Sequence, residues 1–305
     1  MREREMPFVE GVEHRFVTAN GVRFHVAEAG EGEPLLLLHG YPQHWYAWRH
    51  VVPLLAGRYR LIMPDLRGFG WSDAPYRGYD TDSRGDDVLG LMDVLGLERV
   101  RLVGHEWGGW AGFMACLRAP ERFTGYLALN IVHPWPDQKA ARRHAWRMWF
   151  TAFLEYPVVG GAVVRYWPGF TRFLLRLGVT DRSAWTAEVL DEFAESIRPR
   201  ARAHASRALH WQYVLHDIPR LILGQHRLER LTVPTMILFG ADDFALSPQV
   251  LTGGDLHADE LLVRLVPGCG HYIADERPDL VAAAVLEFFG DRALSERWET
   301  SSGEH

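Results

Sequence analysis

The sequence predicts an α/β protein, built on a doubly wound, mostly parallel sheet of eight strands with a helical segment inserted into it. Two observations carry this prediction. Short apolar runs typical of buried strands alternate with helical stretches in the first and last parts of the chain. Between His133 and about His226 the strand pattern stops, and aromatic-rich helical segments replace it. We therefore expect one core in two parts, residues 1–132 and 227–305, with a helical cap at residues 133–226 between them.

The first part of the core opens with a hairpin. Residues 14–19 and 22–28 alternate between apolar and polar side chains, and the Asn20-Gly21 pair between them is a strong turn signal. Continuous apolar runs after the hairpin indicate strands buried on both faces, with helical stretches between them. In chain order these elements are expected at 34–38 (strand), 44–55 (helix), 59–63 (strand), 82–95 (helix), 100–103 (strand), 110–117 (helix) and 124–132 (strand).

The second part of the core resumes the same alternation after residue 231. Strands are expected at 235–239 and 260–266, and a closing helix at 280–289. In a parallel sheet the carboxyl ends of the strands lie along one edge, and ligands bind in the loops there. The loops that follow these strands are therefore the place to look for a functional site.

The inserted cap differs from the core in composition. It holds six of the twelve Trp residues, and residues 138–207 carry 12 Lys and Arg against 6 Asp and Glu, whereas the whole chain has a net charge of −6. An all-helical insertion between strands indicates a lid over the sheet. For its basic residues, a solvated face is favoured over a site for anions.

Gly104-His105-Glu106-Trp107-Gly108-Gly109 stands where a strand turns at once into a helix. Small residues at 104, 108 and 109 permit a tight turn and close packing of the helix on the strand, as in a nucleophile elbow. The residue at the tip is Glu106, and the N-terminus of the following helix favours its ionised form. A Gly-rich junction without chemistry is the alternative.

Two later strand ends supply an acid and a histidine in the chain order that such an elbow needs. The strand at 235–239 runs into Asp242 and Asp243, and the strand at 260–266 is followed by His271. Asp243 is preferred to Asp242 because Gly-x-x-Asp is the common spacing for the acid. Three strand ends in the right order make an elbow with chemistry the favoured interpretation.

An oxyanion hole is expected beside the elbow. His39-Gly40-Tyr41-Pro42 follows the strand at 34–38, and His39-Gly40 is expected to form the loop that presents the second donor; a simple strand-ending turn is the alternative. The backbone N–H groups of Tyr41 and Trp107 are the predicted donors of this hole.

Composition and spacing disfavour several other functions. A net charge of −6 gives no reason to expect a nucleic acid partner. Cys116 and Cys269 make no disulfide framework, and no metal-ligand spacing is present, so neither a metal nor a cofactor is expected. Residues 1–5 show no signal peptide, and the apolar stretch 156–178 is too interrupted to span a membrane. We therefore expect a cytoplasmic protein without a membrane partner.

Taken together, these motifs resemble the epoxide hydrolase branch of the α/β-hydrolase superfamily, over about residues 11–290. Haloalkane and fluoroacetate dehalogenases are related to this branch. The aromatic Tyr41 is typical of epoxide hydrolases, whereas haloalkane dehalogenases commonly have Asn there and fluoroacetate dehalogenases have Arg in place of Trp107. The matching pieces are HGYP at 39–42, DLRGFGWSD at 65–73, GHEWGG at 104–109, GADD at 240–243 and GH at 270–271.

The resemblance implies a two-step reaction on a small apolar epoxide. Glu106 would attack an epoxide carbon and form an ester, and His271, oriented by Asp243, would activate the water that hydrolyses this ester. The nucleophile of the family is ordinarily Asp, so Glu106 departs from the pattern by one methylene.

The resemblance also implies that the cap supplies the acid that protonates the opened ring. Phe150 falls where a Tyr is usual, which leaves His210 and Tyr213 as candidate donors. The expected substrate pocket comprises His39, Pro42, Trp149 and Phe150.

Two alternatives stay open. One is a haloalkane dehalogenase or an esterase-like hydrolase. The other is a non-hydrolytic homologue that binds a ligand or catalyses a biosynthetic rearrangement, which Glu106 and Phe150 favour and the intact pair of Asp243 and His271 disfavours. A homodimer is also left open.

Overall fold

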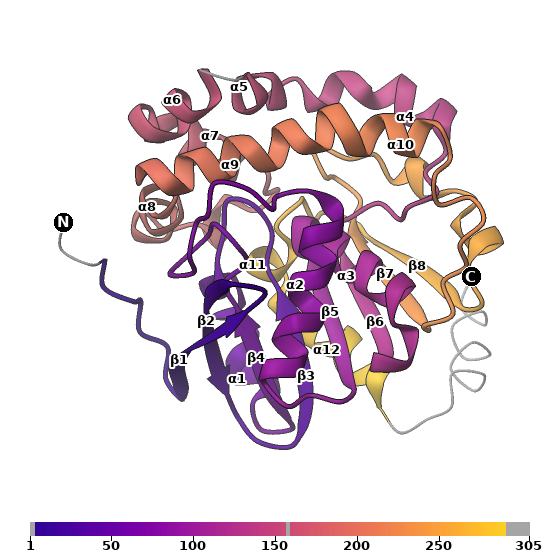
Figure 1. The fold of residues 1–305 in the computed structure, drawn as a ribbon, viewed down its shortest axis with the longest axis horizontal. Coiled ribbons are helices and arrows are strands. Elements are labelled where there is room, and N and C mark those ends of the chain that lie inside the picture. The colour runs from indigo at the N-terminus through magenta and orange to yellow at the C-terminus, as the bar shows by residue number, and fades with distance from the viewer. Residues whose placement is uncertain (1–3, 157–158, 291–305) are drawn as a thin grey trace.

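The computed structural model describes residues 4–156 and 159–290, so both ends of the predicted core lie partly outside the described residues. An eight-stranded sheet in the order β1-β2-β4-β3-β5-β6-β7-β8 forms the centre, with helices on both faces and a layer of helices above it (Figure 1). β2 pairs antiparallel with β1 and β4, and all other neighbours are parallel. The predicted fold class is confirmed. The strands are β1 (Val12–Ala19), β2 (Val22–Ala29), β3 (Glu33–Leu38), β4 (Tyr59–Pro64), β5 (Val100–His105), β6 (Phe123–Leu129), β7 (Thr235–Gly240) and β8 (Leu261–Val266).

The turn between β1 and β2 forms as predicted. Asn20 and Gly21 have φ values of 50° and 73°, and Ala19 pairs with Val22 across the turn. A two-residue turn with both φ values positive matches the twist of a hairpin, and Asn followed by Gly tolerates that backbone best.

β3 shows why a continuous apolar run marks a central strand. Leu36 and Leu38 pack into the core on one face of the sheet, and Leu35 and Leu37 pack on the other, all four with no exposed surface. The helices that cover the first face are α2 (Thr81–Val94) and α3 (Glu106–Arg118); those on the second are α1 (Val52–Leu55) and α12 (Pro278–Phe289), which follows the short α11 (Ile273–Glu276).

Three predicted elements differ from the structure by a break or by more than two residues at an end. The helix expected at 110–117 begins earlier, at Glu106, as α3. The helix expected at 44–55 is split into the 3-10 helix η1 (Trp45–Trp48) and α1, which begins beside Pro53. Proline starts a helix readily but cannot continue one, because it has no N–H to donate. The strand expected at 124–132 ends at Leu129, since Asn130 adopts a left-handed backbone with φ 43°.

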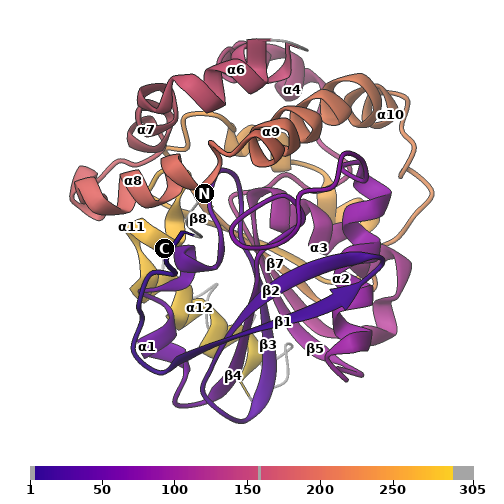
Figure 2. The ribbon, with the colours of Figure 1, turned by 60° about the vertical axis from the view of Figure 1, so that its left-hand side comes forward.

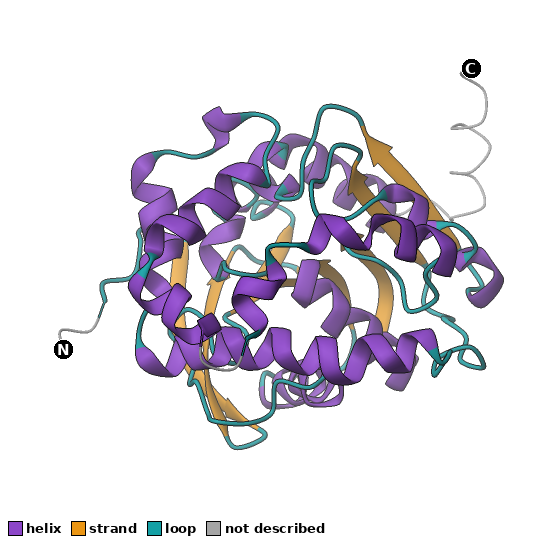
Figure 3. Cartoon of the chain, turned by 90° about the horizontal axis from the view of Figure 1, so that it is seen from above, coloured by secondary structure: helices purple, strands orange, loops and turns teal. Residues whose placement is uncertain are grey.

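The insertion between β6 and β7 forms the upper layer of Figures 1 and 2, and seen from above in Figure 3 its helices lie across the strands. None of the helices within the described ranges is both long and apolar enough to cross a membrane. The elements of this cap are α4 (Gln138–His144), the 3-10 helix η3 (Ala145–Met148), α5 (Thr151–Glu155), α6 (Val159–Tyr166), α7 (Pro168–Leu177), the 3-10 helix η4 (Arg182–Ala184), α8 (Ala187–Ser196), α9 (Arg200–Gln212), the π-helix η5 (Tyr213–Asp217) and α10 (Ile218–Ile222).

The two ends of the cap meet at one place on the core. The indole Nε1–H of Trp135 donates to the carbonyl of His226, at 2.6 Å. The Trp135 ring also stacks on His257 of the core, with 5.1 Å between ring centroids. The chain therefore leaves the core and returns to it at neighbouring points.

Candidate active site

The elbow after β5 holds Glu106 in a strained backbone. Its φ is 48°, which only a tight turn imposes on a residue with a side chain. Close packing explains two of the surrounding glycines. A Cβ on Gly108 would lie 2.5 Å from the carbonyl oxygens of Leu38 and His39, and one on Gly40 would lie 2.7 Å from Glu106 Cβ. The predicted elbow geometry is present.

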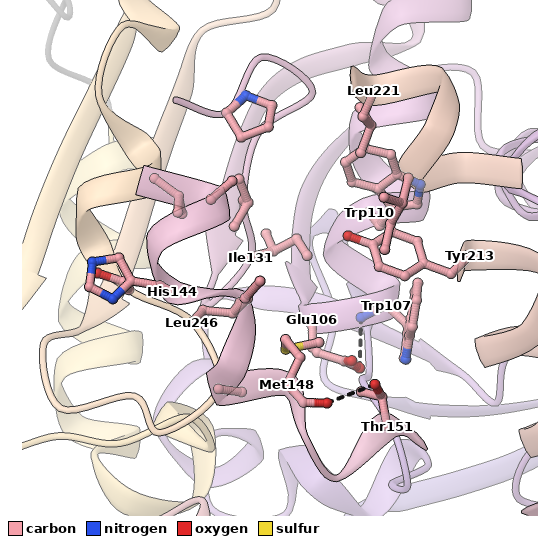
Figure 4. Close-up of a pocket in the computed structure, with 18 of the residues that line it drawn as sticks. Glu106, Trp107, Trp110, Ile131, His144, Met148, Thr151, Tyr213, Leu221 and Leu246 are labelled. Carbon is pink, nitrogen blue, oxygen red and sulfur yellow. Dashed lines mark hydrogen bonds between the residues drawn. The ribbon is translucent and has the colours of Figure 1, made fainter. Parts of the chain in front are cut away.

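One carboxylate oxygen of Glu106 is held by two backbone donors. The N–H groups of Tyr41 and Trp107 donate to Glu106 Oε2 at 2.7 and 2.8 Å, the latter bond drawn in Figure 4. These are the two donors predicted for the oxyanion hole. Both bonds go to Oε2, and the second carboxylate oxygen, Oε1, is not engaged by these donors.

Burial opposes the charge of Glu106 and raises its pKa to about 7. The nearby His271, the two backbone N–H groups and the more distant Arg84 act in the opposite direction and favour the anion. A carboxylate with a pKa near neutrality is partly protonated at pH 7, unlike an ordinary surface Glu.

Asp243 and His271 form the predicted pair beside the elbow. His271 Nδ1–H donates to Asp243 Oδ2 at 2.7 Å. The other oxygen of Asp243 accepts the N–H groups of Ala245 and Leu246 at 2.8 and 3.0 Å. Burial by itself would raise the pKa of Asp243, but His271 and these hydrogen bonds hold it below its ordinary value. Asp242 is exposed instead and accepts the N–H of Gly268.

Asn130 is a part of the site that the sequence interpretation missed. Its amide donates to Asp243 Oδ2 at 2.9 Å and to the Gly270 carbonyl at 3.2 Å. Its left-handed φ aims the side chain at both groups. Its position in the sequence could have indicated this role, because Asn130 directly follows a strand and precedes the strand that leads to Asp243.

Glu106 and His271 both border a cavity of about 390 Å³ between the core and the cap. That size falls within the range of small-molecule sites. Most of the lining is apolar, and Figure 4 shows Tyr213 with its hydroxyl pointing into the cavity. Apolar lining residues include Trp110, Ile131, Met148, Phe150, Leu221 and Leu246.

Three of the four residues predicted for the pocket lie elsewhere. Trp149 is 46% exposed and contacts Phe153 and Phe173 on the outside of the cap. His39 is buried, and its Nε2 accepts the N–H of Leu66 at 2.9 Å, so it braces a loop. Pro42 is buried too and does not line the cavity.

Phe150 is the residue of that prediction which does line the cavity. It follows Trp149 directly, and the two rings pack edge to face with 6.3 Å between centroids, but Phe150 is buried at the cavity while Trp149 is half-exposed. Its ring lies 5.2 Å from that of Phe244.

The two candidate donors differ in hydrogen bonding. His210 lines the cavity, but its Nδ1 lies 2.8 Å from the Ser206 carbonyl, which can only accept, so Nδ1 carries the proton. Burial lowers the pKa of His210 to about 4, which leaves the ring neutral at pH 7 and its Nε2 without a hydrogen. A neutral His in this tautomer cannot donate into the cavity. Tyr213 can, through its hydroxyl.

A buried ion pair, also missed from the sequence, lies behind this wall of the cavity. Arg84 of α2 extends beside Asp217 of η5, and its guanidinium carbon lies 4.7 Å from the centre of the Trp107 ring. Thr81 donates to Asp217 and accepts the indole N–H of Trp110 at 3.0 Å. The network ties the core helix to the π-helical turn that carries Tyr213.

The sheet, the elbow and the strand-end groups together define an α/β hydrolase. The chain matches the α/β hydrolase fold family over residues 33–278 and belongs to it, and it is a hydrolase. It is 29% identical to the soluble epoxide hydrolase of Corynebacterium sp. (strain C12), over 91% of this chain and 97% of that protein. Haloalkane dehalogenase 2 of Mycobacterium bovis is 28% identical over 91% of this chain and 95% of its own length.

A solved structure shows the same architecture. The unliganded epoxide hydrolase CorEH superposes with a TM-score of 0.81 at 26% sequence identity, covering 91% of this chain and 98% of that one. The similarity thus extends across the core and the cap.

Proposed function

We propose that the protein is an epoxide hydrolase for small apolar epoxides, with Glu106 as the nucleophile. The observation that carries the proposal is the Glu106 carboxylate, which is held by two backbone N–H groups at the wall of an apolar cavity that His271 also borders. The similarity to the Corynebacterium epoxide hydrolase and to CorEH supports it.

In the first step Oε1 of Glu106 attacks an epoxide carbon. A C–O bond to the carboxylate forms as the ring C–O bond breaks, and the ring oxygen takes a proton. The ionised form of Glu106 is itself the nucleophile, so this step needs no base, but it does need an acid. Tyr213 is the proposed acid, since its hydroxyl points into the cavity and His210 presents no hydrogen there.

In the second step His271 takes a proton from water as that water attacks the ester carbonyl carbon. Negative charge then develops on Oε2, which already lies against the N–H groups of Tyr41 and Trp107. Collapse of this intermediate breaks the C–O bond to the diol, which receives the proton from His271, and leaves Glu106 as a carboxylic acid with one oxygen from water. The proton of this acid returns through solvent to the Tyr213 phenolate formed in the first step, so the carboxylate and the phenol are both restored.

Electrostatics links the two steps. Burial lowers the pKa of His271, but Asp243 and Glu106 together raise it above its ordinary value. Esterification removes the charge of Glu106, and with it one of the groups that keep His271 protonated. The pKa of His271 therefore falls once the ester has formed, and a larger fraction of the ring is neutral and able to accept a proton.

The test is intact mass spectrometry after incubation with a panel of small epoxides. His271→Gln is expected to accumulate an adduct of substrate mass on Glu106, because alkylation needs no base and hydrolysis does. Asp242→Asn is the matched control: it alters the exposed neighbour of Asp243 and should turn over without an adduct. An adduct mapped to another residue, or none with an epoxide that the parent hydrolyses, would refute the mechanism.

A dehalogenase is the second candidate, and one observation favours it. The indole Nε1–H of Trp107 is buried without a hydrogen-bond partner among the described residues, and Trp107 lines the cavity beside Glu106. A free N–H there can hold a departing halide, and halide release from small haloalkanes distinguishes this activity from epoxide opening.

A further inference from the structure

The outer side of the cap exposes an unusual number of large apolar side chains. They lie on the helices farthest from the sheet, along the top of Figures 1 and 2, and their exposed fractions run from 37% to 71%. We call this surface the aromatic face: Trp146, Trp149, Phe153, Tyr156, Val159, Tyr166, Trp167, Phe173 and Leu177.

Ring contacts join four members of the aromatic face, Trp167 through the buried Phe170. Trp149 lies 6.1 Å from Phe153 and 6.5 Å from Phe173, measured between ring centroids. Phe153 and Trp167 both lie 5.5 Å from Phe170. Contiguous apolar surface of this kind marks an interaction site, whereas single exposed apolar residues do not.

The same segment is strongly basic. Residues 138–177 contain seven Lys and Arg residues and one acidic residue, so the positive excess of the cap falls entirely here, in a chain of net charge −6. Within the described parts of the chain, Arg172 is the one basic residue of this segment that pairs with carboxylates, those of Asp191 and Glu195. Of the other six, Arg142 lines the cavity and Arg147 donates to the Leu246 carbonyl of the core. The remaining cations of the segment are Lys139, Arg143, Arg165 and Arg176.

Charge decides between two occupants of this surface. In a symmetric dimer the same patch meets itself, so a second copy would bring one set of cations against an identical set. An anionic bilayer offers the opposite charge, and Trp and Tyr are the side chains that settle at the boundary between headgroups and acyl chains.

We propose that the aromatic face of the cap docks reversibly on an anionic lipid surface. The docking is peripheral, because no described helix is long enough to cross a bilayer. Basic residues attract the headgroups, and the exposed indole and phenol rings enter the interface.

The position of the aromatic face relative to the cavity suggests what docking would achieve. Ala141, Ala145 and Met148 line the cavity, while Trp146 and Trp149 of the same stretch face outward. A docked cap would hold that wall of the cavity beside a bilayer, where apolar molecules concentrate.

The test compares binding to vesicles of phosphatidylcholine alone with binding to vesicles that also contain phosphatidylglycerol. Co-sedimentation should show binding only to the anionic vesicles, and high salt should abolish it. Trp146→Gln/Trp167→Gln should weaken binding, and Lys139→Gln/Arg143→Gln should weaken it by about fivefold for each cation removed.

Leu223→Gln/Leu228→Gln is the matched control, since both residues are more than 80% exposed but lie outside the aromatic face. It should bind like the parent. Equal binding to the two vesicle types, or unchanged binding by both test variants, would overturn the proposal. So would a dimer in light scattering that Trp146→Gln/Trp167→Gln dissociates. None of these readouts depends on catalysis.

Discussion

Arg84 of the core and Asp217 of the cap form a buried ion pair, with 3.3 Å between Nη2 and Oδ2. Asp217 lies in the same π-helical turn as Tyr213, and π-helical turns often occur at functional sites. The pair therefore both fastens the cap to α2 and fixes the segment that carries the proposed proton donor.

Asp217→Asn is expected to lower the free energy of unfolding by about 3–5 kcal/mol, because it leaves the buried Arg84 without its counter-charge. Urea denaturation at equilibrium measures the change. The double variant Arg84→Met/Asp217→Leu removes both charges and should recover most of the loss. A loss below about 1 kcal/mol for Asp217→Asn would mean that the pair behaves like an exposed one.

Glu106→Gln should make the protein more stable above neutral pH. The folded-state pKa of Glu106 is raised from 4.5 to about 7, so folding favours the neutral form. The penalty of the buried charge is absent below pH 4.5, grows between 4.5 and 7, and reaches about 3 kcal/mol above 7. Urea denaturation of parent and variant over this pH range should show that the difference in their free energies of unfolding grows as the pH rises. A stability difference that does not change with pH would contradict the raised pKa of Glu106.

Tyr213→Phe should slow ester formation by about 10²–10³-fold, the effect of removing one donor from a comparable anion site. His210→Phe should have a much smaller effect, since its Nε2 carries no hydrogen. Single-turnover alkylation of Glu106 in the His271→Gln background isolates this step from hydrolysis. The reverse ranking would assign the proton to His210.

Phe150→Tyr should accelerate ester formation on simple epoxides, by up to about 10²-fold, because it adds a hydroxyl at the cavity wall. The same single-turnover assay applies. Phe153→Tyr is the matched control, as Phe153 is 42% exposed on the outer side of the cap. If both variants behave like the parent, position 150 contributes no acid.

Local pattern predicted the fold and the placement of Glu106, Asp243 and His271 at strand ends, because both depend on neighbouring residues. The catalytic roles of these three residues stay predictions. The apolar run of β3 needs two buried faces, and the turn after β5 needs its glycines wherever the rest of the chain lies. The prediction of the pocket residues was mostly wrong, because local pattern does not tell which side chains face the cavity. Trp149 and Phe150 are adjacent in the sequence, yet the packing of the cap places only Phe150 at the cavity.

Contacts and protonation states that depend on tertiary packing could not be predicted from local sequence pattern. The proton of His210 is placed by Ser206, one helical turn earlier, and burial sets its charge. Arg84 and Asp217 are 133 residues apart, and neither stands out without the other. Such pairs become visible only when the cap is placed on the core.

The meeting of the two cap ends at Trp135 and His226 makes the lid an exchangeable module. An inserted segment whose two ends lie close together can be replaced by another segment without changing the topology of the sheet. Glu106, Asp243 and His271 all lie at strand ends outside the cap, so a transplanted cap would change which molecules reach these three residues while leaving them in place. To pack stably on this core, such a cap would need a carboxylate beside Arg84, in the place that Asp217 occupies here.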